Sequence, residues 1–179
     1  MDFCIVSAGM GKRFEPFAGF ANKALAPFPY ESTISLIIDK IPADSRIFIV
    51  VGYKSKDLSE IIKLFHPDRD IEFIHNDNYM NEGMGDSLLP VLDIAKSPLI
   101  VMPNDGIYSD LSIIKEKDTS DALLTLGCTD NDELLGENYL FLNKEADNVL
   151  SYARGGQIIY NKSQEHKTIF TGLMVIHDI

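Results

Sequence analysis

The sequence has no tryptophan, only two cysteines and no apolar run near the roughly 20 residues that a membrane-spanning helix needs. Cys4 and Cys128 lie in apolar, strand-like runs without the spacing of a zinc site, so both are expected to be reduced core thiols. The N-terminus has no basic segment followed by a long apolar stretch, as a secretory leader would. We therefore expect a cytoplasmic protein that is not inserted into a membrane.

Positive charge is also scarce. Lys and Arg number 16 against 27 Asp and Glu, which leaves a formal charge of -11. Nonspecific attraction to nucleic acid is therefore disfavoured, and nucleic acid is not an expected partner. Any anionic ligand must be bound by local positive charge. The 179 residues, of which 45% are hydrophobic, are enough for one domain with a sizeable core.

Short apolar runs alternate with amphipathic stretches through the first hundred or so residues. The apolar runs predict strands, and the stretches with apolar residues at helical spacing predict helices. The alternation predicts an α/β fold, a Rossmann-like three-layer sandwich with a mostly parallel sheet. Ligands of such sheets bind outside the carboxyl ends of the strands. The predicted strands are 3–8, 47–51, 71–74 and 99–102, and the predicted helices are 34–41, 58–65 and 88–95.

The alternation of predicted strands and helices ends after Asp110. A helix-like stretch through Lys117 precedes further strand-like runs, which we expect to be partly antiparallel and to close a substrate site. The whole chain, 1–179, is therefore interpreted as a single domain. These later predicted strands are 122–126, 139–142, 149–153 and 169–176.

The first predicted strand ends in glycines and cations, in 5-IVSAGMGKRFEPF-17. Glycine lets backbone amides turn towards an anion, so Gly9 and Gly11 would allow the amides of this loop to bind one. Two familiar phosphate-binding motifs do not fit. A Walker loop needs four residues between its glycines, and the dinucleotide fingerprint needs a third glycine where Phe14 stands.

The segment 6-VSAGMGKRFEPFAGFANKALAPF-28 resembles the signature of the sugar-phosphate nucleotidyltransferases, which have a glycine loop followed by a Pro-Lys-x-Leu segment. Three further segments resemble that family in the same order along the chain. The run at 76–79 and the pair at 87–88 also resemble the phosphocholine cytidylyltransferase-like members. The further segments are 49-IVVGY-53, 83-GMGDSL-88 and 99-LIVMPNDGIYSD-110.

The resemblance implies roles for particular residues. Arg13 would clamp the triphosphate and the leaving pyrophosphate, and Lys23 would neutralise the α-phosphate. Asp105 would bind Mg²⁺, the expected cofactor. The nucleotide would lie on residues of the glycine loop and of the later glycine turn. These nucleotide-binding candidates are Ala8, Gly9, Met10, Gly11, Lys12, Asn76, Gly83, Met84 and Gly85, with Asn78, Asp86, Ser87 and Asn104 beside them.

The implied function is transfer of a nucleoside monophosphate from a nucleoside triphosphate, CTP or UTP, to a phosphorylated small molecule with release of pyrophosphate. The acceptor would be a sugar 1-phosphate, for surface polysaccharide or lipid decoration. Cytidylyl transfer to phosphocholine or to another phosphorylated alcohol or amino acid is an alternative. Residues 1–110 would bind the nucleotide, and residues 111–179 would bind the acceptor.

Members of this family normally continue beyond the segment that 171-TGLMVI-176 resembles, and their second metal ligand comes from that later segment. Either the chain is a fragment, or Asp110 or Asp178 supplies the ligand, or metal binding is impaired. A regulatory domain that binds nucleotide without turnover is therefore a further alternative. The sequence makes no prediction of the oligomeric state.

Overall fold

The computed structural model describes residues 1–28, 30–81, 83–96, 98–107, 111, 124–130, 140–145, 148–154 and 168–176. The chain divides into two compact units, Met1–Thr125 with Met174–Ile179 and Leu126–Leu173. The expected single domain with its division between residues 110 and 111 stays a prediction.

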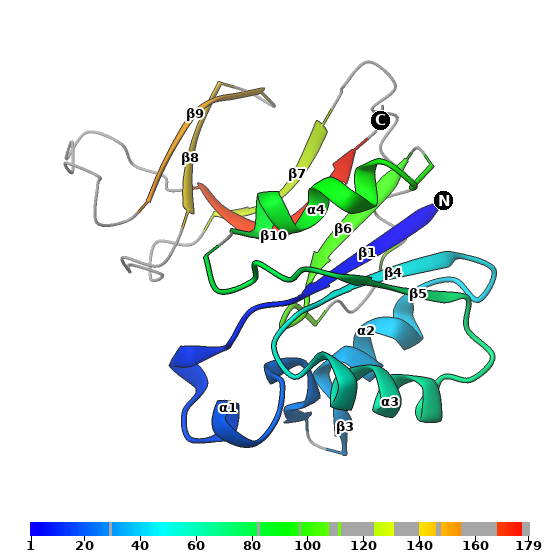
Figure 1. The fold of residues 1–179 in the computed structure, drawn as a ribbon. Coiled ribbons are helices and arrows are strands. Elements are labelled where there is room, and N and C mark those ends of the chain that lie inside the picture. The colour runs from blue at the N-terminus through cyan, green and yellow to red at the C-terminus, as the bar shows by residue number, and fades with distance from the viewer. Residues whose placement is uncertain are drawn as a thin grey trace. The chain divides into compact units, whose positions relative to one another are not determined.

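The first unit is built on a mixed sheet in which four neighbouring strands run parallel (Figure 1). The end of a fifth strand, residues 174–176, pairs antiparallel with the last of them. This order confirms the predicted α/β fold with a mostly parallel sheet. Across the sheet the strands are β5 (Ile71–His75), β4 (Arg46–Val51), β1 (Asp2–Ser7), β6 (Leu99–Pro103) and β10 (Thr168–Ile176).

Helices cover both faces of this sheet. Figure 1 shows α2 (Thr33–Lys40) and α3 (Ser55–Phe65) on one side and α4 (Met84–Leu92) on the other. Successive side chains of a strand point to opposite faces, so a strand covered on both faces must be apolar throughout. The run Ile47–Val50 is fully buried, as the prediction required.

Helix α4 begins at Met84, four residues before the predicted start at residue 88. The carboxylate of Asp86 accepts a hydrogen bond of 3.1 Å from the Gly83 amide, and the Ser87 amide donates to the Gly83 carbonyl. These bonds start the helix at the glycine turn rather than at the first apolar residue. No helix among the described residues combines the length and the apolarity needed to cross a membrane.

The second unit contains an antiparallel hairpin of β8 (Leu140–Glu145) and β9 (Asn148–Arg154). The beginning of β10 pairs antiparallel with β8 through Thr168 and Ile169. Strand β7 spans Leu124–Asp130, later than the predicted 122–126. These strands confirm the antiparallel pairing expected late in the chain. The stretch through Lys117, both candidate ligands Asp110 and Asp178, and the side chain of Cys128 lie outside the described residues.

Cys4 is a fully buried free cysteine on β1. Burial disfavours the thiolate and raises the pKa of the Cys4 thiol to about 12. The thiol therefore stays protonated near neutral pH. This confirms the expected reduced core thiol for Cys4.

At the amino end of the sheet, the buried carboxylate of Asp2 connects β1 to β4 and to the segment before β6. Oδ2 of Asp2 accepts hydrogen bonds from the Arg46 guanidinium at 2.7 Å and from the Lys96 amide at 2.8 Å. Arg46 also donates to the Ile94 carbonyl at 2.8 Å. Burial by itself raises the pKa of the Asp2 carboxyl, but these two hydrogen bonds and the positive charges of Arg46 and the N-terminus together outweigh it, so the pKa lies below the ordinary value of 3.8.

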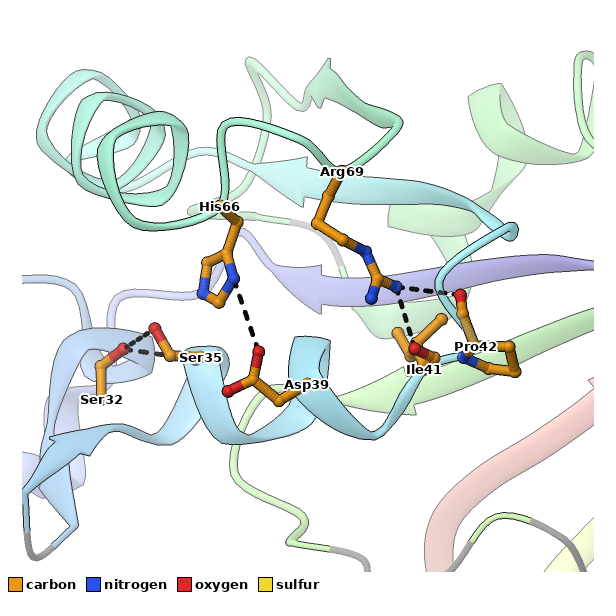
Figure 2. A network of polar contacts seen from close by, with 7 residues as sticks. All are labelled: Ser32, Ser35, Asp39, Ile41, Pro42, His66 and Arg69. Carbon is orange, nitrogen blue, oxygen red and sulfur yellow. Dashed lines mark hydrogen bonds and ion pairs between the residues drawn. The ribbon is translucent and has the colours of Figure 1, made fainter.

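A second polar network joins α2 to the end of α3 (Figure 2). His66, which caps α3, lies with its Nδ1 atom 3.6 Å from the Asp39 carboxylate of α2. Arg69 donates to the carbonyls of Ile41 and Pro42 at 3.0 and 3.1 Å. The imidazole is buried, and this burial lowers the pKa of His66 below its ordinary value of 6.5, against the opposing effect of Asp39.

Candidate functional site

The glycine loop follows β1 directly. Gly11 has a φ of 62°, a left-handed conformation that favours glycine, and its carbonyl accepts a hydrogen bond of 2.7 Å from the Phe14 amide. A Cβ atom at Gly11 would lie 3.1 Å from the Cβ of Lys23, whereas one at Gly9 would meet nothing within 4 Å. Gly11 is therefore needed for the close approach of the Lys23 segment, and Gly9 leaves open space beside the loop.

Two cations project from this loop. Lys12 and Arg13 are exposed and begin the short 3-10 helix η1 (Lys12–Phe14). Within the described residues of the chain, neither side chain takes part in an ion pair. Ala8 is buried and Met10 is half-buried, so the two cations lie at the surface next to an apolar base. This arrangement suits an anion.

Asn22 fastens the segment that carries Lys23. Its side chain is fully buried, and its Nδ2 atom donates to the carbonyls of Ser7 at 3.0 Å and Tyr53 at 2.8 Å. Its Oδ1 atom accepts from the Ala24 amide at 2.9 Å and caps the 3-10 helix η2 (Lys23–Leu25). This role was not predicted from the sequence, where its only signal is an asparagine directly before a predicted functional lysine.

Tyr53, which follows β4, bonds to the glycine loop and to the segment after it. Its amide donates to the Ala8 carbonyl at 3.0 Å, and its hydroxyl donates to the Ala18 carbonyl at 2.8 Å. Gly52 allows this close approach, since a Cβ atom there would lie 2.9 Å from the Ala8 carbonyl oxygen and 2.8 Å from the Tyr79 ring. The loops after β1 and β4 are therefore held against each other, a contact that was not predicted from the sequence.

Lys23 and Asp105 meet at the carboxyl end of the sheet. The Lys23 ammonium donates a hydrogen bond to Oδ2 of Asp105, two residues beyond the end of β6. The two residues are 82 positions apart in the sequence, and their side chains are 29% and 49% exposed. The structure thus brings together the predicted catalytic cation and the predicted metal ligand, both within reach of solvent.

The later glycine turn, with Gly83, Met84 and Gly85, forms the start of α4. Asn76 is 7% exposed, and its amide donates to the Ser87 hydroxyl at 2.9 Å. Its Oδ1 atom accepts from the Asn78 amide at 2.8 Å. Asn76 therefore connects the loop after β5 to the first turn of α4. The contact of Asn76 with a nucleotide base stays a prediction, and so do the roles assigned to the other candidate site residues.

Comparisons with known proteins find no matching family model and no matching curated protein. Solved structures do match. The inositol-1-phosphate CTP transferase from T. maritima is 14% identical, with a TM-score of 0.76 over 98% of this chain and 70% of that chain. This chain has the nucleotidyltransferase fold.

Two further nucleotidyltransferase structures support this assignment of the fold. The CTP:phosphocholine cytidylyltransferase from Streptococcus pneumoniae is 19% identical, with a TM-score of 0.67 over 99% of this chain and 71% of that chain. UDP-glucose pyrophosphorylase, solved with UDP-glucose, is 13% identical, with a TM-score of 0.76 over 99% of this chain and 76% of that chain. Each of these three matches thus covers 98 or 99% of this chain.

The residues present are compatible with the expected Mg²⁺. Magnesium is usually bound through one or two carboxylates and completed by water and substrate phosphates. Asp105 offers one half-exposed carboxylate that already has a cation, Lys23, beside it. Among the described residues, no group of three or more His, Cys, Asp or Glu side chains is placed to hold a metal ion. This donor set fits a metal shared with a phosphorylated ligand.

Proposed function

We propose that this chain is a Mg²⁺-dependent nucleotidyltransferase that transfers a nucleoside monophosphate from a nucleoside triphosphate to a phosphorylated small molecule and releases pyrophosphate. An acceptor phosphate oxygen attacks the α-phosphorus, and the bond to the β-phosphate oxygen breaks. Both reactants are anions, so positioning and charge neutralisation supply most of the rate. No covalent nucleophile of the protein is needed.

The contact between Lys23 and Asp105 is the observation that carries this proposal. It joins a lysine after the glycine loop to a carboxylate after β6, at the strand ends where α/β sheets bind ligands. In the reaction, the Lys23 ammonium would neutralise the α-phosphate. Asp105 would hold Mg²⁺, which when bound supplies positive charge to the phosphates of both substrates.

The glycine loop would bind the rest of the triphosphate. A Cβ atom built at Gly9 would meet nothing within 4 Å, and in this open space the amides of Met10 to Lys12 would bind phosphate oxygens. Arg13 is exposed, and its planar guanidinium suits bidentate contact with the β- and γ-phosphates that leave as pyrophosphate. Asn22 would hold Lys23 in place and would not touch the substrate.

The nucleotide is proposed to be CTP, with UTP as the second choice. Two of the structures that share this fold are named as CTP-using enzymes, acting on inositol 1-phosphate and on phosphocholine. A sugar 1-phosphate is the proposed acceptor class, and phosphocholine is the alternative. We further propose that the reaction takes place in the cytoplasm and serves polysaccharide or lipid decoration.

Pyrophosphate release by the purified chain tests the proposal. Each of the four common nucleoside triphosphates is paired with sugar 1-phosphates, inositol 1-phosphate and phosphocholine, in the presence of Mg²⁺. Release that requires one particular pair is the expected result. Chelation of the metal should abolish that release, and added Mg²⁺ should restore it.

Asp105→Asn is the informative variant, because the amide keeps the shape of the carboxylate but loses its charge. Its activity should fall by at least about a hundredfold and should respond less steeply to Mg²⁺. Nucleotide binding without turnover in every pairing would contradict the enzyme and favour a regulatory nucleotide-binding domain. Activity that does not depend on Asp105 would contradict the assigned metal ligand.

A further inference from the structure

A serine, a histidine and an aspartate lie in a row that the proposed transfer does not use. The Ser55 hydroxyl is 2.9 Å from Nε2 of His75, and Nδ1 of the same ring is 3.1 Å from the Asp77 carboxylate. When the ring proton is on Nδ1, beside the carboxylate, Nε2 is the acceptor for the serine proton. This is the order of groups that activates a serine in acyl-transfer enzymes of unrelated folds.

The backbone brings these residues together through regular structure. His75 is the last residue of β5 and pairs with Val51, the last residue of β4, so it lies beside the turn that leads to Ser55. The Asn76 amide donates to the Val51 carbonyl at 2.9 Å and fixes the chain between His75 and Asp77. The serine and its base are thus held by a strand end and a helix start.

Ser55 is also the first residue of α3, where backbone amides have no partner within the helix. Lys54, the residue before it, adopts a left-handed conformation with a φ of 50°, and no side chain caps the helix. The amides of Lys56 and Asp57 are therefore open to a negative charge that develops next to Ser55. A nucleophile and amides that can stabilise an oxyanion thus occur at one helix start.

We propose that Ser55 is a nucleophile activated by His75 and Asp77, and that it forms an acyl-serine with small activated esters. The Ser55 oxygen bonds to the ester carbonyl carbon, and its proton passes to Nε2 of His75. The leaving alcohol departs as the carbon–oxygen bond breaks and takes that proton. Water, deprotonated by the same nitrogen, then releases the acid and restores Ser55. His75 and Asp77 are 54% and 93% exposed, so the site suits small esters rather than an enclosed substrate.

Two probes test this on the full chain. The first is p-nitrophenyl acetate, followed by release of p-nitrophenol. The second is an alkyl fluorophosphonate, which bonds to the serine oxygen and expels fluoride to leave a stable adduct. Peptide mass spectrometry then locates the modification. Ser55 should be modified, and His75→Phe should lower its modification by at least about a hundredfold, the contribution of a general base. Asp77→Asn should have a smaller effect, since Asp77 is exposed.

The chain contains its own controls. Ser59 lies one helical turn further along α3, and its hydroxyl donates to the Ser55 carbonyl instead of contacting a histidine. Ser59 should stay unmodified, and acetylation of Lys56 by the ester should be equal in the parent and in His75→Phe. Because His75 is exposed, the His75→Phe variant should fold, which circular dichroism verifies. Modification of Ser55 no greater than that of Ser59, or equal with and without His75, would overturn the proposal.

Discussion

The two ends of the central sheet differ in how their charged groups are used. At the amino end, Asp2 is 5% exposed and its carboxylate binds Arg46 and the Lys96 amide. At the carboxyl end, Arg13 is exposed, and Lys23 and Asp105 remain within reach of solvent although they contact each other. The first end uses its charges in internal hydrogen bonds, and the second keeps them accessible to a ligand.

This difference indicates which residues stabilise the fold and which perform the chemistry. A charge whose partners are all internal contributes to the free energy of unfolding, and removing it leaves buried groups unpaired. A half-exposed charge contributes little to stability but can act on a bound anion. Asn22 is uncharged but connects the two roles, since it is buried like Asp2 and fixes the segment that carries Lys23.

Lys23→Met should give the largest effect. The variant removes the charge expected at the α-phosphate, so the rate of pyrophosphate release should fall by at least about a hundredfold, or about 2.7 kcal/mol of barrier. Its thermal midpoint should stay close to that of the parent because the contact with Asp105 is half-exposed. Lys40→Met, at an exposed lysine of α2, is the matched control and should keep full activity. Parent-like activity in Lys23→Met would contradict the assigned role.

Asn22→Ala should lower both the stability of the fold and the activity. It leaves the Ser7 and Tyr53 carbonyls and the Ala24 amide without their partner, which should cost about 2 to 4 kcal/mol of unfolding free energy in urea titrations. Asn22→Asp should cost at least as much at neutral pH, since a carboxylate would face two carbonyls. Asn78→Ala, at an exposed asparagine, should change stability by less than about 0.5 kcal/mol. Equal stability of Asn22→Ala and Asn78→Ala would show that the buried bonds carry no net energy.

Asp2→Asn should lower stability without lowering the activity of the folded fraction. We expect a loss of about 1 to 2 kcal/mol at neutral pH, because the amide cannot replace the charge facing Arg46. The pKa of Asp2 is lowered in the folded state, so this stabilisation is present above 3.8 and is lost as the pH falls further. The difference between parent and variant should therefore shrink in acid. Asp44→Asn, at an exposed position, is the control, and a difference that stays constant with pH would be against this account.

His66→Gln should have the smallest effect, visible in the pH dependence of stability. The folded state disfavours the protonated imidazole, so the unfolded chain binds the proton more readily and the parent loses stability as the pH falls through 6.5. The variant should lose less stability than the parent between pH 7 and pH 5. Asp39→Asn should steepen the loss, because Asp39 raises the pKa of His66. An identical dependence of stability on pH in the parent and both variants would rule out His66 as the cause of the loss in acid.

The sequence by itself determined the parallel sheet and its helices. Strands covered on both faces, such as Ile47–Val51, must be apolar throughout, and amphipathic helices must repeat their apolar residues, so both leave a local pattern. The start of α4 was misplaced because it depends on the bond between Asp86 and the Gly83 amide rather than on apolar spacing. The glycine loop and the two predicted site charges were located through the resemblance of their motifs.

Only the tertiary structure decided what holds those charges. The contact of Lys23 with Asp105 closes 82 residues of chain, and Asn22 acts through Ser7 and Tyr53 on two other loops. The row from Ser55 to Asp77 likewise depends on the pairing of His75 with Val51. Local sequence cannot specify such contacts, because the energy of each is realised only after the strands have paired in register and brought their loops to the same edge.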